Sequence, residues 1–141
     1  MKILILEDNE LRNNQFRKNL IGHTIEIVDN VKDLKTHLLR TQWDILFLDH
    51  DLGGEHYISF ENENTGSGAA RWLNQNPDKQ PPMIFLHSLN ESGRKNMKSL
   101  LPKSVGTPFI WSLLDSETIT TEYFRTEVFK LAERQNITGE C

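Results

Sequence analysis

Short apolar segments alternate along the chain with longer segments in which apolar residues recur at helical spacing. The clearest apolar run is Ile45–Leu48, within a predicted central strand from Asp44 to Asp49. A continuous apolar run of this length is typical of a strand buried on both faces of a sheet. Apolar runs predict three further strands, at Ile3–Leu6, Met83–Leu86 and Phe109–Leu114. Alternation of apolar and polar residues predicts a fourth, at His23–Val28.

A helix is predicted after each strand, and side chains that can cap a helix stand at the expected places. In the first helix, Leu11, Phe16 and Leu20 are expected on one face. The segment 53–66 is predicted to be a long polar loop, of the kind that forms lids or binding loops. The capping candidates are Asn9, Asn30, Thr65 or Ser67, and Asn90 or Ser92, and Thr121 opens a last amphipathic helix.

Five strand–helix repeats predict an α/β, flavodoxin-like fold: a five-stranded parallel sheet with helices on both faces and right-handed crossovers. The common strand order for such a sheet is 2-1-3-4-5. The 141 residues suit one domain, 1–141, with a core over 1–114 and a C-terminal helix at about 120–136. No output domain is expected after this core, so we expect a stand-alone unit.

Composition narrows the classes of partner. The net charge of −4 argues against nonspecific nucleic-acid binding, and we expect neither sequence-specific DNA binding nor a membrane partner. The one cysteine, Cys141, allows neither an intrachain disulfide nor a cysteine metal cluster. The opening apolar run is too short for a signal sequence or a membrane span. A cytoplasmic protein is therefore expected.

Chemistry-bearing residues follow three of the predicted strands. In the order 2-1-3-4-5, the ends of strands 1, 3 and 4 lie side by side at one edge of the sheet. The acids could instead serve only to make a loop soluble, but they recur at separate strand ends. One crevice is thus expected to hold Glu7 and Asp8, Asp49, His50 and Asp51, and His87 and Ser88.

Several carboxylates in one crevice require a compensating cation, since each raises the pKa of its neighbours. An oxygen ligand set suits Mg²⁺, with Mn²⁺ as the alternative, and such a site handles phosphoryl groups. Asp49 would be a nucleophile that forms an aspartyl phosphate, or a ligand or base that directs a water. Ser88 would hydrogen-bond a phosphoryl oxygen, and His50 and His87 would act as general acid or base.

Three segments resemble a response-regulator receiver domain: LILEDN at Leu4–Asn9, ILFLD at Ile45–Asp49 and FLHS at Phe85–Ser88. The similarity extends from Met1 to about Leu114. It implies that Glu7, Asp8 and Asp49 form a metal site, that Asp49 accepts a phosphoryl group, and that Ser88 or His87 stands at the switch hydroxyl position.

The sequence departs from ordinary receivers in two ways. The predicted fifth strand lacks the lysine that ends it in receivers, and the nearest lysine, Lys103, precedes it. The motifs LDHDLGG and HSLNESG resemble instead the divergent receiver branch proposed to process cyclic phosphates. That resemblance implies a metal held by Glu7, Asp8 and Asp49, with Asp51 as a fourth candidate ligand. It also implies catalytic or substrate contacts from His50, His87, Ser88 and Asn90.

Three functions remain open. The first is a metal-dependent phosphoesterase, such as a cyclic phosphodiesterase, acting on a nucleotide or an RNA end. The second is a single-domain response regulator phosphorylated on Asp49 by a phosphodonor kinase, with Phe109 and Trp111 as switch aromatics. The third is a protein that only binds a phosphate ligand or a partner. The substrate is open, and a homodimer is compatible with the last helix.

Overall fold

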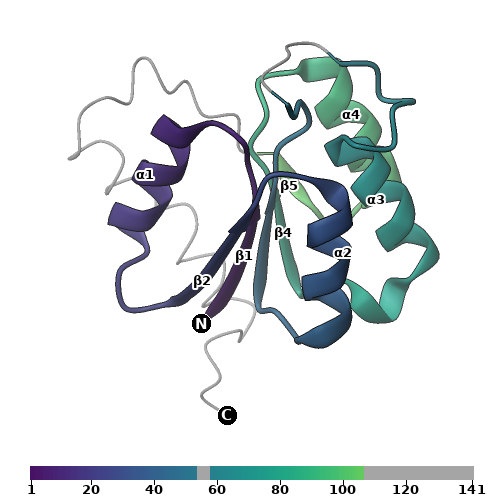
Figure 1. Cartoon of the computed structure of the whole chain (residues 1–141). Helices are drawn as coiled ribbons and strands as arrows, with labels where there is room; N and C mark the ends of the chain where they lie inside the picture. The colour runs from purple at the N-terminus through teal and green to yellow at the C-terminus, as the bar shows by residue number, and fades with distance from the viewer. Residues whose placement is uncertain (54–57, 107–141) are drawn as a thin grey trace.

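A computed structural model of the protein describes residues 1–53 and 58–106, in which helices cover both faces of a five-stranded sheet (Figure 1). The strands are β1 (Lys2–Leu6), β2 (Thr24–Val28), β3 (Ile45–Leu48), β4 (Met83–Leu86) and β5 (Val105–Gly106). The helices are α1 (Glu10–Asn19), α2 (Val31–Arg40), α3 (Gly66–Gln75), α4 (Glu91–Leu100) and the short 3₁₀ helix η1 (Pro77–Lys79). None of the helices described is long and apolar enough to cross a membrane.

The strand order is β2-β1-β3-β4-β5 and every pairing is parallel, which confirms the predicted topology. The register of the strands determines which residues lie side by side at the carboxyl edge of the sheet. Leu6 of β1 pairs with Leu48 of β3, and Leu48 pairs with Leu86 of β4. The residues that follow these three leucines therefore leave the sheet side by side, and they are Glu7, Asp49 and His87.

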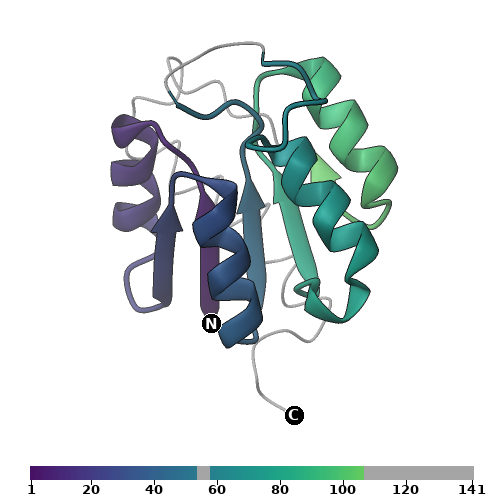
Figure 2. The ribbon, with the colours of Figure 1, turned by 45° about the vertical axis from the view of Figure 1, so that its right-hand side comes forward.

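The alternation of side chains along buried strands divides the core into two layers. Helix α1 covers one face of the sheet, and α2, α3 and α4 cover the other (Figure 2). The layer beneath α1 consists of Ile3, Ile5, Phe16, Leu20, Ile45, Phe47, Met83 and Phe85. The opposite layer is built on Leu4, Leu6, Leu46, Leu48, Ile84 and Leu86, with apolar residues of the three helices packed against them.

Side-chain caps fix where the helices begin. Asn9 Oδ1 accepts a hydrogen bond from the backbone of Arg12, and Asn30 caps α2 in the same way. Of the alternatives left open by the sequence, Thr65 caps α3 and Asn90 caps α4. Replacing such a cap by alanine typically costs about 1 kcal/mol.

Two predictions about elements are wrong. Leu11 does not share the buried face of α1 with Phe16, because it is 78% exposed. Within the described residues the fifth strand is Val105–Gly106, so it begins earlier than predicted. The segment Phe109–Leu114, with Phe109 and Trp111, and the helix predicted at about 120–136 lie outside the described residues.

Candidate metal centre

Glu7, Asp49 and His87 meet where β1, β3 and β4 end. One ligand atom of each residue lies within 4.8 Å of the others. The three residues are 0%, 3% and 0% exposed, respectively. The parallel register thus gathers, inside the protein, three groups that are 80 residues apart at the extremes.

Glu7 lies next to both other residues of this centre. Its Oε1 lies 3.0 Å from Nε2 of His87, and its Oε2 accepts hydrogen bonds from the backbone N–H groups of Asp8 and Asn9 at 3.0 and 3.1 Å. A carboxylate oxygen of Glu7 also lies within 4.8 Å of one of Asp49. Two carboxyl groups in such contact need a proton or a cation between them.

Burial is the largest cause of the pKa shift of each group in this centre. Burial, followed by the adjacent Glu7 carboxylate, raises the pKa of Asp49 to about 7. Burial also raises the pKa of Glu7, although Arg12 and a backbone hydrogen bond act in the opposite direction. Burial lowers the pKa of His87 to about 4, so the imidazole is neutral at pH 7 and does not neutralise the carboxylates.

Arg12 of α1 is a cation that contacts this centre. Its Nε lies 3.1 Å from Oε1 of Glu7, and its side chain is 18% exposed. The contact is an ion pair without the alignment of a hydrogen bond, because this buried Nε–H has no properly directed acceptor among the described residues. The guanidinium therefore offsets the charge of Glu7 only in part.

The donor set suits a divalent metal ion. Two carboxylates and one imidazole are ligands that Mn²⁺ and other first-row transition metals accept, whereas Mg²⁺ prefers oxygen ligands alone. His87 thus changes the oxygen-only set expected from the sequence. Asp8, half-buried, and Asp51 do not belong to the group of ligand atoms that the described residues bring together.

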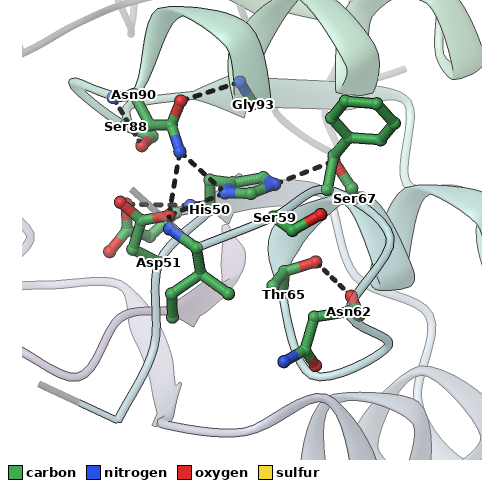
Figure 3. Close-up of polar contacts among 12 residues, drawn as sticks. His50, Asp51, Ser59, Asn62, Thr65, Ser67, Ser88, Asn90 and Gly93 are labelled. Atoms are coloured by element: carbon green, nitrogen blue, oxygen red, sulfur yellow. Dashed lines mark hydrogen bonds and ion pairs between the residues drawn. The ribbon is translucent and has the colours of Figure 1, made fainter. Parts of the chain in front are cut away.

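Asp51 instead belongs to a second cluster, the His50 network, which consists of His50, Asp51, Ser67 and Asn90 (Figure 3). Nδ1 of His50 lies 2.8 Å from Oδ1 of Asp51, and Nε2 lies 2.9 Å from Oγ of Ser67. Nδ2 of Asn90 donates to the same Asp51 oxygen at 3.0 Å. The network ties the end of β3 to the starts of α3 and α4.

These contacts determine how the His50 ring is used. Because a carboxylate can only accept, Nδ1–H donates to Asp51, and Nε2 then accepts from the Ser67 hydroxyl. The order Ser–His–Asp is that of a nucleophilic relay. However, His50 and Ser67 are both 0% exposed, so no substrate reaches the hydroxyl in this arrangement.

Gly93 packs directly on the His50 ring. A Cβ at this position would overlap three atoms of the imidazole. The first turn of α4 therefore approaches His50 only because residue 93 is a glycine. The sequence motif that contains Gly93 consequently serves to pack the ring, in addition to turning the chain.

The two polar residues after His87 have different surroundings. Ser88 is 2% exposed, and its Oγ accepts a hydrogen bond from the backbone of Asn90 at 3.1 Å, which leaves its hydroxyl proton to be donated elsewhere. The Asn90 side chain caps α4 through Gly93 and holds Asp51. The sequence does not identify Arg12 and Ser67 as parts of the site, because its pattern predicts their positions in the helices but not the directions of their side chains.

The match to a family agrees with this geometry. The family described as "Cyclic-phosphate processing Receiver domain" matches residues 2–103. No curated protein matches significantly. The resemblance noted in the sequence is thereby confirmed.

Solved structures show the same fold at low identity. The Mn²⁺-bound form of response regulator Rcp1 has a TM-score of 0.65 and 18% identity, covering 89% of this chain and 92% of that chain. The phosphorylated cyanobacterial phytochrome response regulator RcpA has a TM-score of 0.63 and 19% identity, covering 87% and 91%. TrrA from Thermotoga maritima, in complex with Mg²⁺–BeF, has a TM-score of 0.58 and 16% identity, covering 83% and 95%. These likenesses concern the fold.

Proposed function

This chain belongs to the cyclic-phosphate processing receiver domains, and on that premise we propose that it is a metal-dependent phosphoesterase that opens the cyclic phosphate of a nucleotide or an RNA end. The observation that carries the proposal is the buried group of Glu7, Asp49 and His87 at the carboxyl edge of the sheet. Its carboxyl groups have raised pKa values, which is the electrostatic condition that a divalent ion relieves.

In this proposal Glu7, Asp49 and His87 hold the ion, Mn²⁺ or Mg²⁺. The bound ion would supply a Lewis acid that polarises the phosphoryl group. Coordination through Nε2 of His87 requires the ring proton to reside on Nδ1, and the Phe16 and Phe47 rings at 5.3 and 6.1 Å restrain the imidazole. Asp8 and Asp51, also expected as ligands, would act from outside the group of three.

The neighbouring residues orient the substrate and the site. Ser88 would donate its hydroxyl proton to a phosphoryl oxygen. We assign His50 and Asn90 to positioning rather than to contact with substrate, because their polar atoms are engaged with Asp51, Ser67 and Gly93. In the reaction a water oxygen bonds to phosphorus, one ester P–O bond breaks, and the proton of the water goes to the leaving hydroxyl.

The test is hydrolysis of a panel of cyclic phosphates with Mn²⁺ or Mg²⁺, followed by ³¹P NMR. The panel contains 2′,3′-cyclic nucleotides, 3′,5′-cyclic nucleotides and an RNA oligonucleotide with a 2′,3′-cyclic phosphate end. We expect a phosphomonoester product that disappears with chelator and in Asp49→Asn. Asp78→Asn is the matched control, since its carboxylate is 76% exposed in η1. No turnover of any panel member would overturn the proposal.

A second candidate is phosphorylation of Asp49. The observation in its favour is that this carboxyl ends β3 in a fold shared with phosphorylated RcpA. Against it, Asp49 is 3% exposed and accepts a hydrogen bond from the backbone of His50. Treatment with acetyl phosphate and Mg²⁺, followed by intact-mass measurement, separates the two candidates: a stable adduct at Asp49 supports signalling, and its absence supports the esterase.

A further inference from the structure

Arg12 has an arrangement that pairing with Glu7 does not explain. Its buried Nε contacts the Glu7 carboxylate, at 3.1 Å. Within residues 1–53 and 58–106, neither terminal nitrogen of this guanidinium has a hydrogen-bond partner. The Arg12 side chain is 18% exposed, whereas Nε itself is buried.

The location of Arg12 indicates a role for its two terminal nitrogens. Glu7 links Arg12 on one side to His87 on the other, so the guanidinium lies beside the candidate metal centre. A guanidinium with two free terminal nitrogens presents a planar fork that matches two oxygens of a phosphoryl group. Its position is steadied by α1, whose start is capped by Asn9 at the same turn.

We propose that Arg12 is the phosphoryl-recognition residue of this site, binding the anionic oxygens of a phosphate ester through its terminal nitrogens while Nε remains on Glu7. This inference rests on the proposed function for the identity of the ester, but the binding of the anion itself does not require turnover. The ligand class is a phosphate monoester or a cyclic diester held next to the metal ion.

The proposal makes two affinities move in opposite directions. Removing the guanidinium takes a positive charge away from Glu7, so Mn²⁺ should bind more tightly. Removing it also takes away two charge-assisted hydrogen bonds, so an anion should bind more weakly, by about 10- to 100-fold. A residue that merely supported the fold of Glu7 would weaken both affinities together.

The experiment uses Arg12→Gln, Arg12→Lys and the control Arg17→Gln, on the same helix but paired with the exposed Glu10. Mn²⁺ affinity is measured by EPR, and the affinity of the Mn²⁺-loaded protein for inorganic phosphate by calorimetry. We expect both Arg12 variants to lose phosphate affinity without losing Mn²⁺ affinity, and Arg17→Gln to match wild type. Arg12→Lys keeps the positive charge but removes the two terminal nitrogens of the guanidinium. It therefore tests their role even if Arg12→Gln does not fold.

Two results would overturn the inference: unchanged phosphate affinity in both Arg12 variants, or a joint loss of Mn²⁺ and phosphate binding in Arg12→Lys. Failure of the proposed function looks different. In that case wild type turns over no cyclic phosphate, yet the variants still show weakened phosphate binding. Conversely, turnover by wild type together with either of the two results above would preserve the esterase and reject the role of Arg12.

Discussion

The two buried histidines near the carboxyl edge of the sheet have opposite surroundings. Both ring nitrogens of His50 have partners in the His50 network, and Gly93 closes over the ring. His87 instead faces two carboxyl groups whose pKa values are raised, and its own pKa is lowered to about 4. The same residue type at neighbouring strand ends thus completes a structural network in one place and borders buried carboxyl groups with raised pKa values in the other.

This difference locates function better than residue identity does. A network whose donors and acceptors are matched gains nothing from a ligand, and it contributes rigidity. A buried group of carboxylates that lacks a cation is stabilised when one binds. We therefore expect changes in the His50 network to affect stability, and changes around His87 to affect ligand binding.

The sharpest test of the comparison replaces each histidine by glutamine. His87→Gln should weaken Mn²⁺ binding by at least about 100-fold, because a direct ligand is lost. Its stability should fall less than that of His50→Gln, since a glutamine amide can still donate to Glu7. His50→Gln should do the reverse, lowering the free energy of unfolding by about 1–3 kcal/mol because buried partners lose their hydrogen bonds.

EPR titration with Mn²⁺ and urea unfolding of the metal-free protein measure the two effects. If the two variants lost metal affinity and stability in the same proportions, the distinction between the clusters would be wrong. Each of the two variants is the control for the other, since the chemical change is identical and both side chains are 0% exposed.

The next largest effect is expected from Gly93→Ala. At an unobstructed helical position this change is stabilising, by up to about 1 kcal/mol. Here the new methyl group overlaps the His50 ring, so we expect a loss of about 1–3 kcal/mol in urea unfolding. Gly106→Ala is the control, because no described atom lies within 4 Å of its Cβ position. Stabilisation by Gly93→Ala would show that the ring is not confined.

Mn²⁺ binding at the centre formed by Glu7, Asp49 and His87 should depend on pH. The pKa of Asp49 is raised to about 7, so below that pH a proton must leave before the ion binds. Mn²⁺ affinity should therefore rise about tenfold per pH unit up to about 7, or about 1.4 kcal/mol per unit for one proton, and then level off. The pKa of His87 is about 4, so the imidazole adds no slope above pH 5.

Proton release on adding Mn²⁺ to weakly buffered protein measures this effect directly. We expect about one proton or more per ion near pH 6, with Glu7 adding to Asp49, and less at pH 8. Release that is independent of pH would mean that the ion binds elsewhere.

The sequence predicts the framework of the site better than its inner contacts. Uninterrupted apolar runs identify β1, β3 and β4, and the strand order then brings Glu7, Asp49 and His87 to one edge. By contrast, the part of β5 that the structure describes is Val105–Gly106, which shows no apolar pattern. In the sequence, Gly106 is followed by Thr107 and Pro108, so the strand-5 lysine of receivers is missing here as well.

What pattern cannot supply is the direction of each side chain once a strand ends. One example is Asp51, two residues after Asp49, whose carboxylate lies against His50 and Asn90. Arg12 is three residues past the cap of α1, and nothing in its spacing shows that Nε returns to Glu7. Such contacts depend on rotamers and tertiary packing, which local periodicity does not encode.

The smallest effect expected is that of Ser67→Ala, and it bears on the resemblance of Ser67, His50 and Asp51 to a nucleophilic relay. Loss of one buried hydrogen bond to His50 should lower stability by about 1 kcal/mol. Hydrolysis of cyclic phosphates should continue within about twofold of wild type, since the 0% exposed hydroxyl meets no substrate. Ser99→Ala, on the exposed side of α4, controls for the loss of a hydroxyl. Abolished turnover in a folded Ser67→Ala protein would instead make Ser67 the nucleophile and move the chemistry from His87 to His50.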